Sequence, residues 1–498
     1  MPQRNDTAIW SGLFRISAES GQTLQAQIRQ AIVAAILDRQ IAASMPLPSC
    51  RILAEKLGVA RGTVVLAFQQ LVDQGFLVAR ERRGHFVNPE VIASPPKPLQ
   101  KTEQQPAEQV DWKALRKIEP SELSPRPPRD NWIKAAYPFV YGQFDPTLFP
   151  TPEWRECNRM ALAVLEIRNW AADVGDRDDP LLIEQIQARL LPRRGIFANP
   201  DEIIVTLGAQ NALYMLATLL MSKGSKVAME NPGYPDARNI FRLAGAEIAP
   251  TPVDAEGIVT SAIPQDAGFV FVTPSHQCPT MVSLSPERRA DLLKRASRDN
   301  QIIIEDGYDG QLIDDAPQQA LKSQDKSGRV IYVGSMSKTL APGLRLGYIV
   351  ASAELIAELR ALRRFMLRHP PANNQRAVAL FLSLGHHDAL VRRLSAAFEE
   401  RRKRLFAAIG TYLPDWRATD PAGGSSLWLE GPRGAEARFI AEAAARRGVL
   451  FEPGDRFFDV QERPTRFMRL GISSIAQQYI EPGVRELAAS IERRAVAA

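Results

Sequence analysis

The feature that most constrains the fold is a series of short apolar runs, rich in β-branched residues, from residue 202 onward. The runs cover residues 202–206, 226–229, 268–272, 301–304 and 329–333. Segments with helical periodicity lie between them, at 209–221, 236–243 and 286–298. Such runs are typical of strands in a parallel sheet that helices cover on both faces. The pattern predicts an α/β fold with a doubly wound sheet, followed by long helices at 389–408 and 435–447 around a strand at Ser426–Glu430.

Length and composition limit the number of domains and the class of protein. The chain has 498 residues, which at roughly 100–200 residues per domain predicts two or more domains. Apolar residues make up 45% and charged residues 24%, which excludes a disordered chain, a coiled-coil rod and a fibre. No apolar run reaches the length of a membrane span, and the N-terminus lacks the apolar core of a signal peptide. We therefore expect no membrane association and a cytoplasmic protein.

The cysteines support the same compartment. Cys50, Cys157 and Cys278 are too few and too scattered for a disulfide framework or a zinc site. We expect them to be small buried apolar side chains, and we expect no metal.

The N-terminal part has the pattern of a winged helix-turn-helix. Its first helix, 22–38, carries an apolar stripe formed by Leu24, Ile28, Ile32 and Ile36. Ser49 can cap a second helix, Cys50–Leu57, which Gly58 ends. A third helix, 61–74, follows after three residues and has an inward face formed by Val64, Val65, Phe68, Leu71 and Val72. Two short strands, 76–78 and 85–87, flank a turn at 82–84.

This module is basic, and a different composition follows it. Residues 22–89 hold eight Lys or Arg against four Asp or Glu, so +4 of the net charge of +6 lies there. Such a module on a nearly neutral body is typical of binding to a polyanion, although solubility would explain the same balance. Residues 94–131 then hold eight prolines, which predicts a partly extended linker with a helical turn near 112–118.

Residues that could bind a ligand or react follow three of the predicted strands. Ligands of doubly wound sheets bind at the carboxyl ends of strands. Asp306 follows the strand 301–304 in the motif EDGYD at 305–309. A buried carboxylate at this point needs a partner, and a protonated heterocyclic nitrogen would serve. A helix-capping acid is the alternative.

The strand 329–333 leads into a segment with a lysine, two serines and an arginine. A desolvated Lys338 would have a lowered pKa and a nucleophilic amine, whereas a solvated loop lysine is the alternative. The hydroxyls and guanidinium nearby suit a phosphate, and they belong to Ser335, Ser337 and Arg345. After the strand 202–206, a glycine turn opens a helix at Ala209 and Gln210, whose free N–H groups also suit a phosphate.

Together these motifs resemble those of the fold-type I, pyridoxal-phosphate-dependent aminotransferases of class I/II. The run SMSKTLAPGLRLGY at 335–348 is similar to their lysine motif and EDGYD to their aspartate–tyrosine motif, in the family's order. The resemblance implies a large and a small domain, with Lys338 as the catalytic residue that holds pyridoxal 5′-phosphate as a Schiff base. It implies Asp306 at the pyridine nitrogen, Tyr308 at the phenolic oxygen and Tyr234 stacked on the ring.

The same resemblance assigns the remaining site residues. It places around the phosphate Ala209, Gln210, Ser335, Ser337 and Arg345. It places Arg469 at the carboxylate of a substrate or effector. His276 and Gln277 lie near the position of a cofactor-contacting asparagine in that family, and which of them substitutes stays open.

The run at 47–87 resembles the winged helix-turn-helix of GntR-type repressors. The resemblance implies DNA contacts by Arg51, Arg61 and Thr63 and a wing with Gly84 at its tip. A GntR-type head, a linker and an aminotransferase-like body together resemble the MocR subfamily of bacterial regulators, which also has the TPSHQ motif found at 273–277. We predict the head at 15–90, the linker at 91–131 and the effector domain at 132–498.

Two departures from that family bear on catalysis. The loop at 174–182 lacks a tyrosine that reaches the neighbouring subunit's phosphate, and it lacks a final glycine. Met281 stands where the family usually has glycine. Both departures weaken the case for catalytic turnover more than the case for cofactor binding.

The resemblance implies a homodimeric transcriptional regulator that binds operator DNA and senses an amino acid or amine through aldimine exchange at Lys338. An active aminotransferase with an accessory DNA-binding domain is the alternative. A third possibility is a sensor of the vitamer alone, which the retained Arg469 disfavours.

Overall fold

The computed structural model describes residues 21–42, 46–81, 83–93, 110–123, 132–308, 319–419, 423–459 and 463–495. It has two compact units, Met1–Leu115 and Arg116–Ala498. The division falls inside the predicted linker, of which residues 94–109 and 124–131 lie outside the described residues, as do Arg82 of the predicted wing turn and Asp309 of the EDGYD motif. The boundaries 15–90, 91–131 and 132–498 stay predictions.

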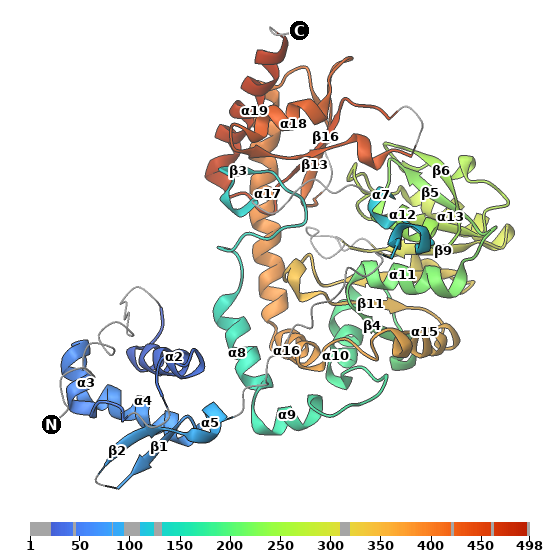
Figure 1. The fold of residues 1–498 in the computed structure, drawn as a ribbon. Coiled ribbons are helices and arrows are strands. Elements are labelled where there is room, and N and C mark those ends of the chain that lie inside the picture. The colour runs from blue at the N-terminus through green and yellow to red at the C-terminus, as the bar shows by residue number, and fades with distance from the viewer. Residues whose placement is uncertain are drawn as a thin grey trace. The chain divides into compact units, whose positions relative to one another are not determined.

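The first unit folds as a winged helix-turn-helix (Figure 1). Its elements are α2 (Leu24–Leu37), α3 (Cys50–Leu57), α4 (Arg61–Asp73), β1 (Leu77–Arg80), β2 (Gly84–Val87), α5 (Pro89–Ala93) and α6 (Trp112–Leu115). The Ser49 hydroxyl accepts a hydrogen bond from Ile52 N and caps α3, and Gly58 ends that helix in the left-handed conformation (φ +63°). The strands β1 and β2 pair antiparallel and form the wing.

The core of this unit corrects two predictions. Ile28, Ile32 and Ile36 of α2 are buried, but Leu24 is 41% exposed because it lies in the first turn, beyond the core. In α4, Val65 is 42% exposed and the small side chain of Ala67 is buried instead. Each residue turns about 100° around a helix, so Val65 points away from the face that carries its neighbour Val64.

The second unit is built on an eight-stranded sheet with the order β4-β11-β10-β9-β8-β5-β6-β7. The strands are β4 (Ile203–Thr206), β5 (Lys226–Asn231), β6 (Glu247–Asp254), β7 (Gly257–Ile258), β8 (Phe269–Val272), β9 (Ile302–Asp306), β10 (Val330–Ser335) and β11 (Gly347–Val350). The pairs between β5, β8, β9 and β10 are parallel, as expected. Strand β6, which the sequence analysis did not predict, also runs parallel to β5. The sheet is not purely parallel, however, because β11 runs antiparallel between β10 and β4, and β7 runs antiparallel to β6.

Successive strand residues pack on opposite faces of this sheet. Ile304 belongs to a core with α11, α12 and α15, whereas its neighbour Ile303 packs with α13 on the other face. Both faces are buried, which explains why these strands read as continuous apolar runs. The helices around the sheet are α10 (Pro180–Gln185), α11 (Ala209–Leu220), α12 (Pro235–Leu243), α13 (Pro286–Arg298), α14 (Leu321–Gln324), α15 (Ala353–Met366) and α16 (Ala372–Ser383).

A smaller part packs around a four-stranded antiparallel sheet of order β12-β13-β16-β15. Its strands are β12 (Arg417–Ala418), β13 (Ser426–Glu430), β15 (Glu452–Pro453) and β16 (Phe467–Gly471). Its helices are α17 (His386–Tyr412), α18 (Ala437–Ala445) and α19 (Ile480–Ala495), and the long α17 lies beside α19 (Figure 1). The unit also contains α7 (Pro120–Leu123), α8 (Thr151–Ala161), α9 (Val164–Trp170), and the parallel pair β3 (Tyr137–Pro138) and β14 (Val449–Leu450).

The structure bears on the expectations about membrane-spanning helices and about the cysteines. Among the described residues, no helix combines the length and the apolar character that a membrane crossing requires. Cys157 and Cys278 are buried and all three cysteines are free thiols, but Cys50 is only half-buried.

Candidate functional site

One cavity of about 280 Å³ in the second unit gathers the residues that the sequence motifs single out at the strand ends. Its lining includes Ala209, Gln210, Tyr234, Asp306, Tyr308, Ser335, Ser337, Lys338, Arg345 and Arg469. They come from the carboxyl ends of β9 and β10, from the N-termini of α11 and α12, and from β16. Open α/β sheets hold ligands at this edge.

Asp306 is the last residue of β9 and is almost fully buried. Its Oδ1 has no hydrogen-bond partner among the described residues. Burial raises the pKa of Asp306 to about 7, although Lys338 acts in the opposite direction. A buried carboxyl oxygen that faces a cavity without a donor needs one from a ligand. The neighbouring Glu305 has a structural role, because its carboxylate accepts from Leu321 N and Lys322 N.

Lys338 points its amine to a segment that follows β3. Its Nζ lies 4.3 Å from the ring centroid of Tyr141, and a Cβ on Gly142 would meet Nζ at 2.6 Å. Gly142 also has φ +76°, so glycine is required there for two reasons. The missing side chain leaves the lysine amine room to move within the cavity.

The predicted phosphate seat lies between the end of β4 and the loop after β10. Gly208 has φ +78°, and a Cβ there would approach the guanidinium of Arg345 to 3.4 Å. Arg345 Nη2 donates to Leu207 O at 3.2 Å, which places its charge at the start of α11. The Ser337 hydroxyl is buried and has no partner among the described residues. Together they offer a free hydroxyl, a guanidinium and a helix N-terminus to an oxyanion.

Two tyrosines flank the same cavity. Tyr234 is the residue before α12, and burial and nearby acids raise the pKa of its hydroxyl, so it stays protonated. The Tyr308 hydroxyl donates to His276 O at 2.9 Å, and its ring meets that of Tyr141 edge to face. The predicted contact of Tyr308 with the phenolic oxygen of a cofactor is not tested by this geometry.

The choice between His276 and Gln277 as a cofactor-contacting residue stays open. Neither residue is among the described ones that line the cavity, whereas Cys278 is. The Gln277 amide is fully used: it donates to Pro232 O and Cys278 O and accepts from Thr280 N. Cys278 directly follows the TPSHQ motif at 273–277, and this adjacency is the sequence signal that could have placed it at the cavity.

Met281, the second departure, adopts a left-handed backbone conformation with φ +65° and is fully buried. Glycine reaches this region without strain, and a side chain costs about 1–2 kcal/mol there. The Met281 side chain fills space beside the Tyr308 hydroxyl, at 4.0 Å from its sulfur. This contact is a packing interaction that glycine cannot make.

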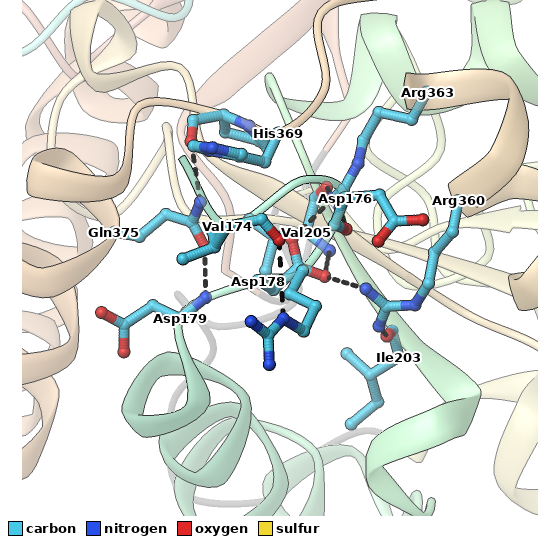
Figure 2. Close-up of polar contacts among 12 residues, drawn as sticks. Val174, Asp176, Asp178, Asp179, Ile203, Val205, Arg360, Arg363, His369 and Gln375 are labelled. Atoms are coloured by element: carbon cyan, nitrogen blue, oxygen red, sulfur yellow. Dashed lines mark hydrogen bonds and ion pairs between the residues drawn. The ribbon is translucent and has the colours of Figure 1, made fainter. Parts of the chain in front are cut away.

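The loop at 174–182, the first departure, is held by buried ion pairs (Figure 2). The Asp178 side chain is 1% exposed and accepts from Arg363 Nη1 at 2.6 Å, from Arg360 Nη1 at 2.8 Å and from Val205 N at 3.2 Å. Arg363 also donates to Val205 O and Arg360 to Ile203 O. Because β4 is the edge strand of the sheet, these side chains satisfy backbone groups that a further strand would otherwise pair.

The next residue in the loop has its own structural role. Asp179 caps α10 by accepting from Leu181 N and Leu182 N, and its own N donates to Gln375 Oε1 (Figure 2). These bonds tie the loop to α10 and α16. The loop is therefore anchored within its own chain.

Arg469 lies on β16, and its guanidinium is paired within the chain. Nε donates to Glu452 Oε2 at 2.8 Å and Nη2 to the same oxygen at 2.5 Å. The guanidinium stacks on the ring of Tyr141, with 3.8 Å from its carbon to the ring centroid. Sequence reasoning missed Glu452, Tyr141 and Arg456, all of which line the cavity.

The predicted DNA contacts lie on the surface of the first unit. Arg51 and Arg61 are exposed in the first turns of α3 and α4, Thr63 is half-buried, and Gly84 opens β2 with φ +93°. The N-terminal turn of a recognition helix is the part that meets base edges and phosphates. No group of His, Cys, Asp and Glu suited to a metal ion occurs in the described parts of the chain.

Comparisons with known proteins identify both units. The family model for aminotransferase class I and II matches residues 143–487, and that for bacterial regulatory proteins of the gntR family matches residues 24–87. Among solved structures, the α-aminoadipate aminotransferase LysN from Thermus thermophilus, complexed with N-(5′-phosphopyridoxyl)-L-leucine, has a TM-score of 0.71 at 25% identity and covers 78% of this chain and 100% of its own. The chain therefore combines a GntR-type DNA-binding head with a fold-type I aminotransferase body.

Relatives that match nearly the full length of the chain define its protein family more closely. The chain is 42% identical to the HTH-type transcriptional regulator TauR of Rhodobacter capsulatus, over 95% of this chain and 98% of the relative. It is 30% identical to the probable rhizopine catabolism regulatory protein MocR of Rhizobium meliloti, over 93% and 92%. The chain belongs to the MocR subfamily of GntR-type transcriptional regulators.

Proposed function

We propose that the chain is a regulator that holds pyridoxal 5′-phosphate at Lys338 and changes its binding to operator DNA when a small amino compound enters the cavity. One observation carries the proposal. A single cavity is lined by an amine, by a buried carboxyl oxygen that has no partner among the described residues, and by an oxyanion seat, in a chain that also has a winged helix-turn-helix. The phosphopyridoxyl compound in the related LysN structure supports the choice of cofactor.

The residues present fit this cofactor. Lys338 would bond it covalently. Asp306 would accept a hydrogen bond from its ring nitrogen at Oδ1, the oxygen for which the described part of the chain supplies no donor. Tyr234 would stack on the ring and Tyr308 would meet the phenolic oxygen. The phosphate would lie among Ala209, Gln210, Ser335, Ser337 and Arg345. When bound, the cofactor supplies an aldehyde carbon that primary amines attack.

The position of Lys338 links the cavity to the small part of the unit. Its Nζ lies on the ring of Tyr141, and the segment 139–141 packs on β16, where Gly471 N donates to Phe139 O. An amine that takes the place of Lys338 changes this contact. Regulation then requires that the two arrangements bind the effector with different affinity. In a homodimer, two heads would read two half-sites.

Replacing Arg61 by alanine is expected to weaken binding to the preferred operator by about 1–3 kcal/mol, because its guanidinium lies in the first turn of α4. The operator would be selected from random duplexes, and affinities would be measured by fluorescence anisotropy. Arg29→Gln on α2 is the charge-matched control, which should weaken operator and unrelated DNA alike. Equal binding of the unchanged protein to all duplexes would contradict the regulator function.

Catalytic turnover is expected to be slower than ~1 per second, the lower end of typical enzyme rates. The loop at 174–182 offers no tyrosine, so the cofactor phosphate lacks a brace from that loop. Proton transfer by Lys338 needs a rigidly held cofactor, whereas amine exchange needs only access. Stopped-flow absorption with amino acids and added keto acid measures both. Repeated turnover at enzyme-like rates would favour the aminotransferase alternative.

A further inference from the structure

Within the described part of the chain, three arginines line the cavity, and their surroundings differ. Arg345 lies at the start of α11, next to Leu207 O, where the phosphate would be bound. Arg469 and Arg456 lie in the small part of the unit, on β16 and in the short helix Asp455–Phe457. An effector that carries an acid group besides its amine therefore meets two guanidinium groups away from the phosphate.

The guanidinium of Arg469 is already paired with a carboxylate, that of Glu452. Its side chain is 5% exposed and that of its partner Glu452 is 4% exposed, and two of its nitrogens donate to the same Glu452 oxygen. Burial alone would lower the pKa of Arg469, but Glu452 raises it above its ordinary value. The third nitrogen, Nη1, lies 3.8 Å from Cys278 Sγ. An effector carboxylate could bind at Nε and Nη2 only by displacing Glu452 and leaving that charge buried without its partner, which is strongly unfavourable.

Arg456 is in the opposite situation. Its backbone carbonyl accepts from Arg238 Nη2, but within the described residues its guanidinium makes no hydrogen bond and no ion pair. The guanidinium carbon lies 5.8 Å from the centroid of the Phe457 ring. Since Arg469 and Glu452 cancel each other, Arg456 supplies the net positive charge at this end of the cavity.

We infer that Arg456 binds the anionic group of the effector and that Glu452 keeps Arg469 from doing so. The inference rests on the proposed function, because it concerns the amine that reaches Lys338. The effector is then a small primary amine with an oxyanion group, such as a carboxylate or a sulfonate, which suits the guanidinium fork. Tyr141 and Phe457, which stack on Arg469, hold the Arg469–Glu452 pair in place beside it.

Two matched amines test the inference. β-Alanine and n-propylamine have three carbons and one primary amine each, and only β-alanine has a carboxylate. Dissociation constants come from the change in visible absorption of protein loaded with pyridoxal phosphate, and the shift in operator affinity gives a second readout. The unchanged protein is expected to prefer β-alanine by about tenfold or more, as one charge-assisted hydrogen bond provides.

The variants separate the two arginines. Arg456→Gln should remove the preference by weakening β-alanine alone, while the exposed control Arg433→Gln should keep it. Adding Glu452→Gln to Arg456→Gln should restore the preference, because Arg469 then becomes available. In Glu452→Gln with Arg469→Gln, which leaves no buried charge unpaired, the preference should persist.

Three outcomes would overturn the inference while the proposed function stands: equal affinities for the two amines in the unchanged protein, a preference that survives Arg456→Gln, or no restoration by Glu452→Gln. If neither amine changes the absorption or the operator affinity of the unchanged protein, the proposed function itself is wrong and the inference falls with it.

Discussion

Replacing Lys338 by alanine is expected to abolish the covalent attachment of pyridoxal phosphate completely. In the unchanged protein, borohydride should fix the cofactor to this lysine, because among the described residues that line the cavity only Lys338 has an amine that can bond an aldehyde carbon. The measurement is mass spectrometry of the intact protein after reduction, followed by peptide mapping of the modified residue. The visible absorption of the lysine-linked cofactor should disappear in the same variant.

Lys322 provides the control for this experiment. Burial lowers the pKa of Lys322, so its amine is also a candidate nucleophile, but Lys322 is not among the residues that line the cavity. Lys322→Ala should retain the full adduct. An adduct of undiminished yield in Lys338→Ala would show that another lysine is the anchor and that the assignment of the site is wrong.

Replacing Asp178 by alanine is expected to lower the free energy of unfolding of the second unit by about 3–5 kcal/mol, because Arg363 would be left buried without its carboxylate. The loss also removes the acceptor for Val205 N on the edge strand β4, just before the predicted phosphate seat. Urea titration followed by circular dichroism and by cofactor absorption measures the effect on the fold and on the seat.

Asp173 is a matched control in the same part of the chain. It also pairs with an arginine, Arg368, but both side chains are more than half exposed. Exposed ion pairs contribute about 0–1 kcal/mol, so Asp173→Ala should leave the unfolding midpoint nearly unchanged. Equal losses of unfolding free energy in the two variants would mean that the contacts of Asp178 with Arg360, Arg363 and Val205 N do not stabilise the edge of the sheet.

Local patterns in the sequence predicted most of the framework. Helices α3 and α13 and strand β13 have the predicted bounds, because capping residues and apolar periodicity act over a few neighbours. Strands β6 and β7 of the eight-stranded sheet were missed, and so was its strand β11. Strand β11 has only four residues, follows shortly after Arg345, and owes its strand conformation to pairing with β4 and β10 on both sides.

The residues of the candidate site likewise fall into those that the sequence predicted and those that it did not. Motif residues at strand ends, such as Asp306 and Lys338, line one cavity because strands that run in parallel bring their carboxyl ends to one edge of the sheet. Their roles stay predictions. Tyr141, Glu452 and Arg456 have no motif spacing relative to these residues, so sequence reasoning had no ground for placing them in the cavity.

What the sequence by itself determined is the class: a winged head, a fold-type I aminotransferase body and the lysine, aspartate and arginine of its motifs. These follow from local periodicity and from spacing within single motifs. Tertiary structure alone decided which charges are available. Asp178 pairs with Arg363 and accepts from Val205 N on the edge strand β4, and Arg469 is neutralised by Glu452. Arg456 lines the cavity with a guanidinium that no carboxylate among the described residues neutralises. Pairing of charges depends on distances between segments that are remote in the chain, and burial makes each such pair hard to exchange.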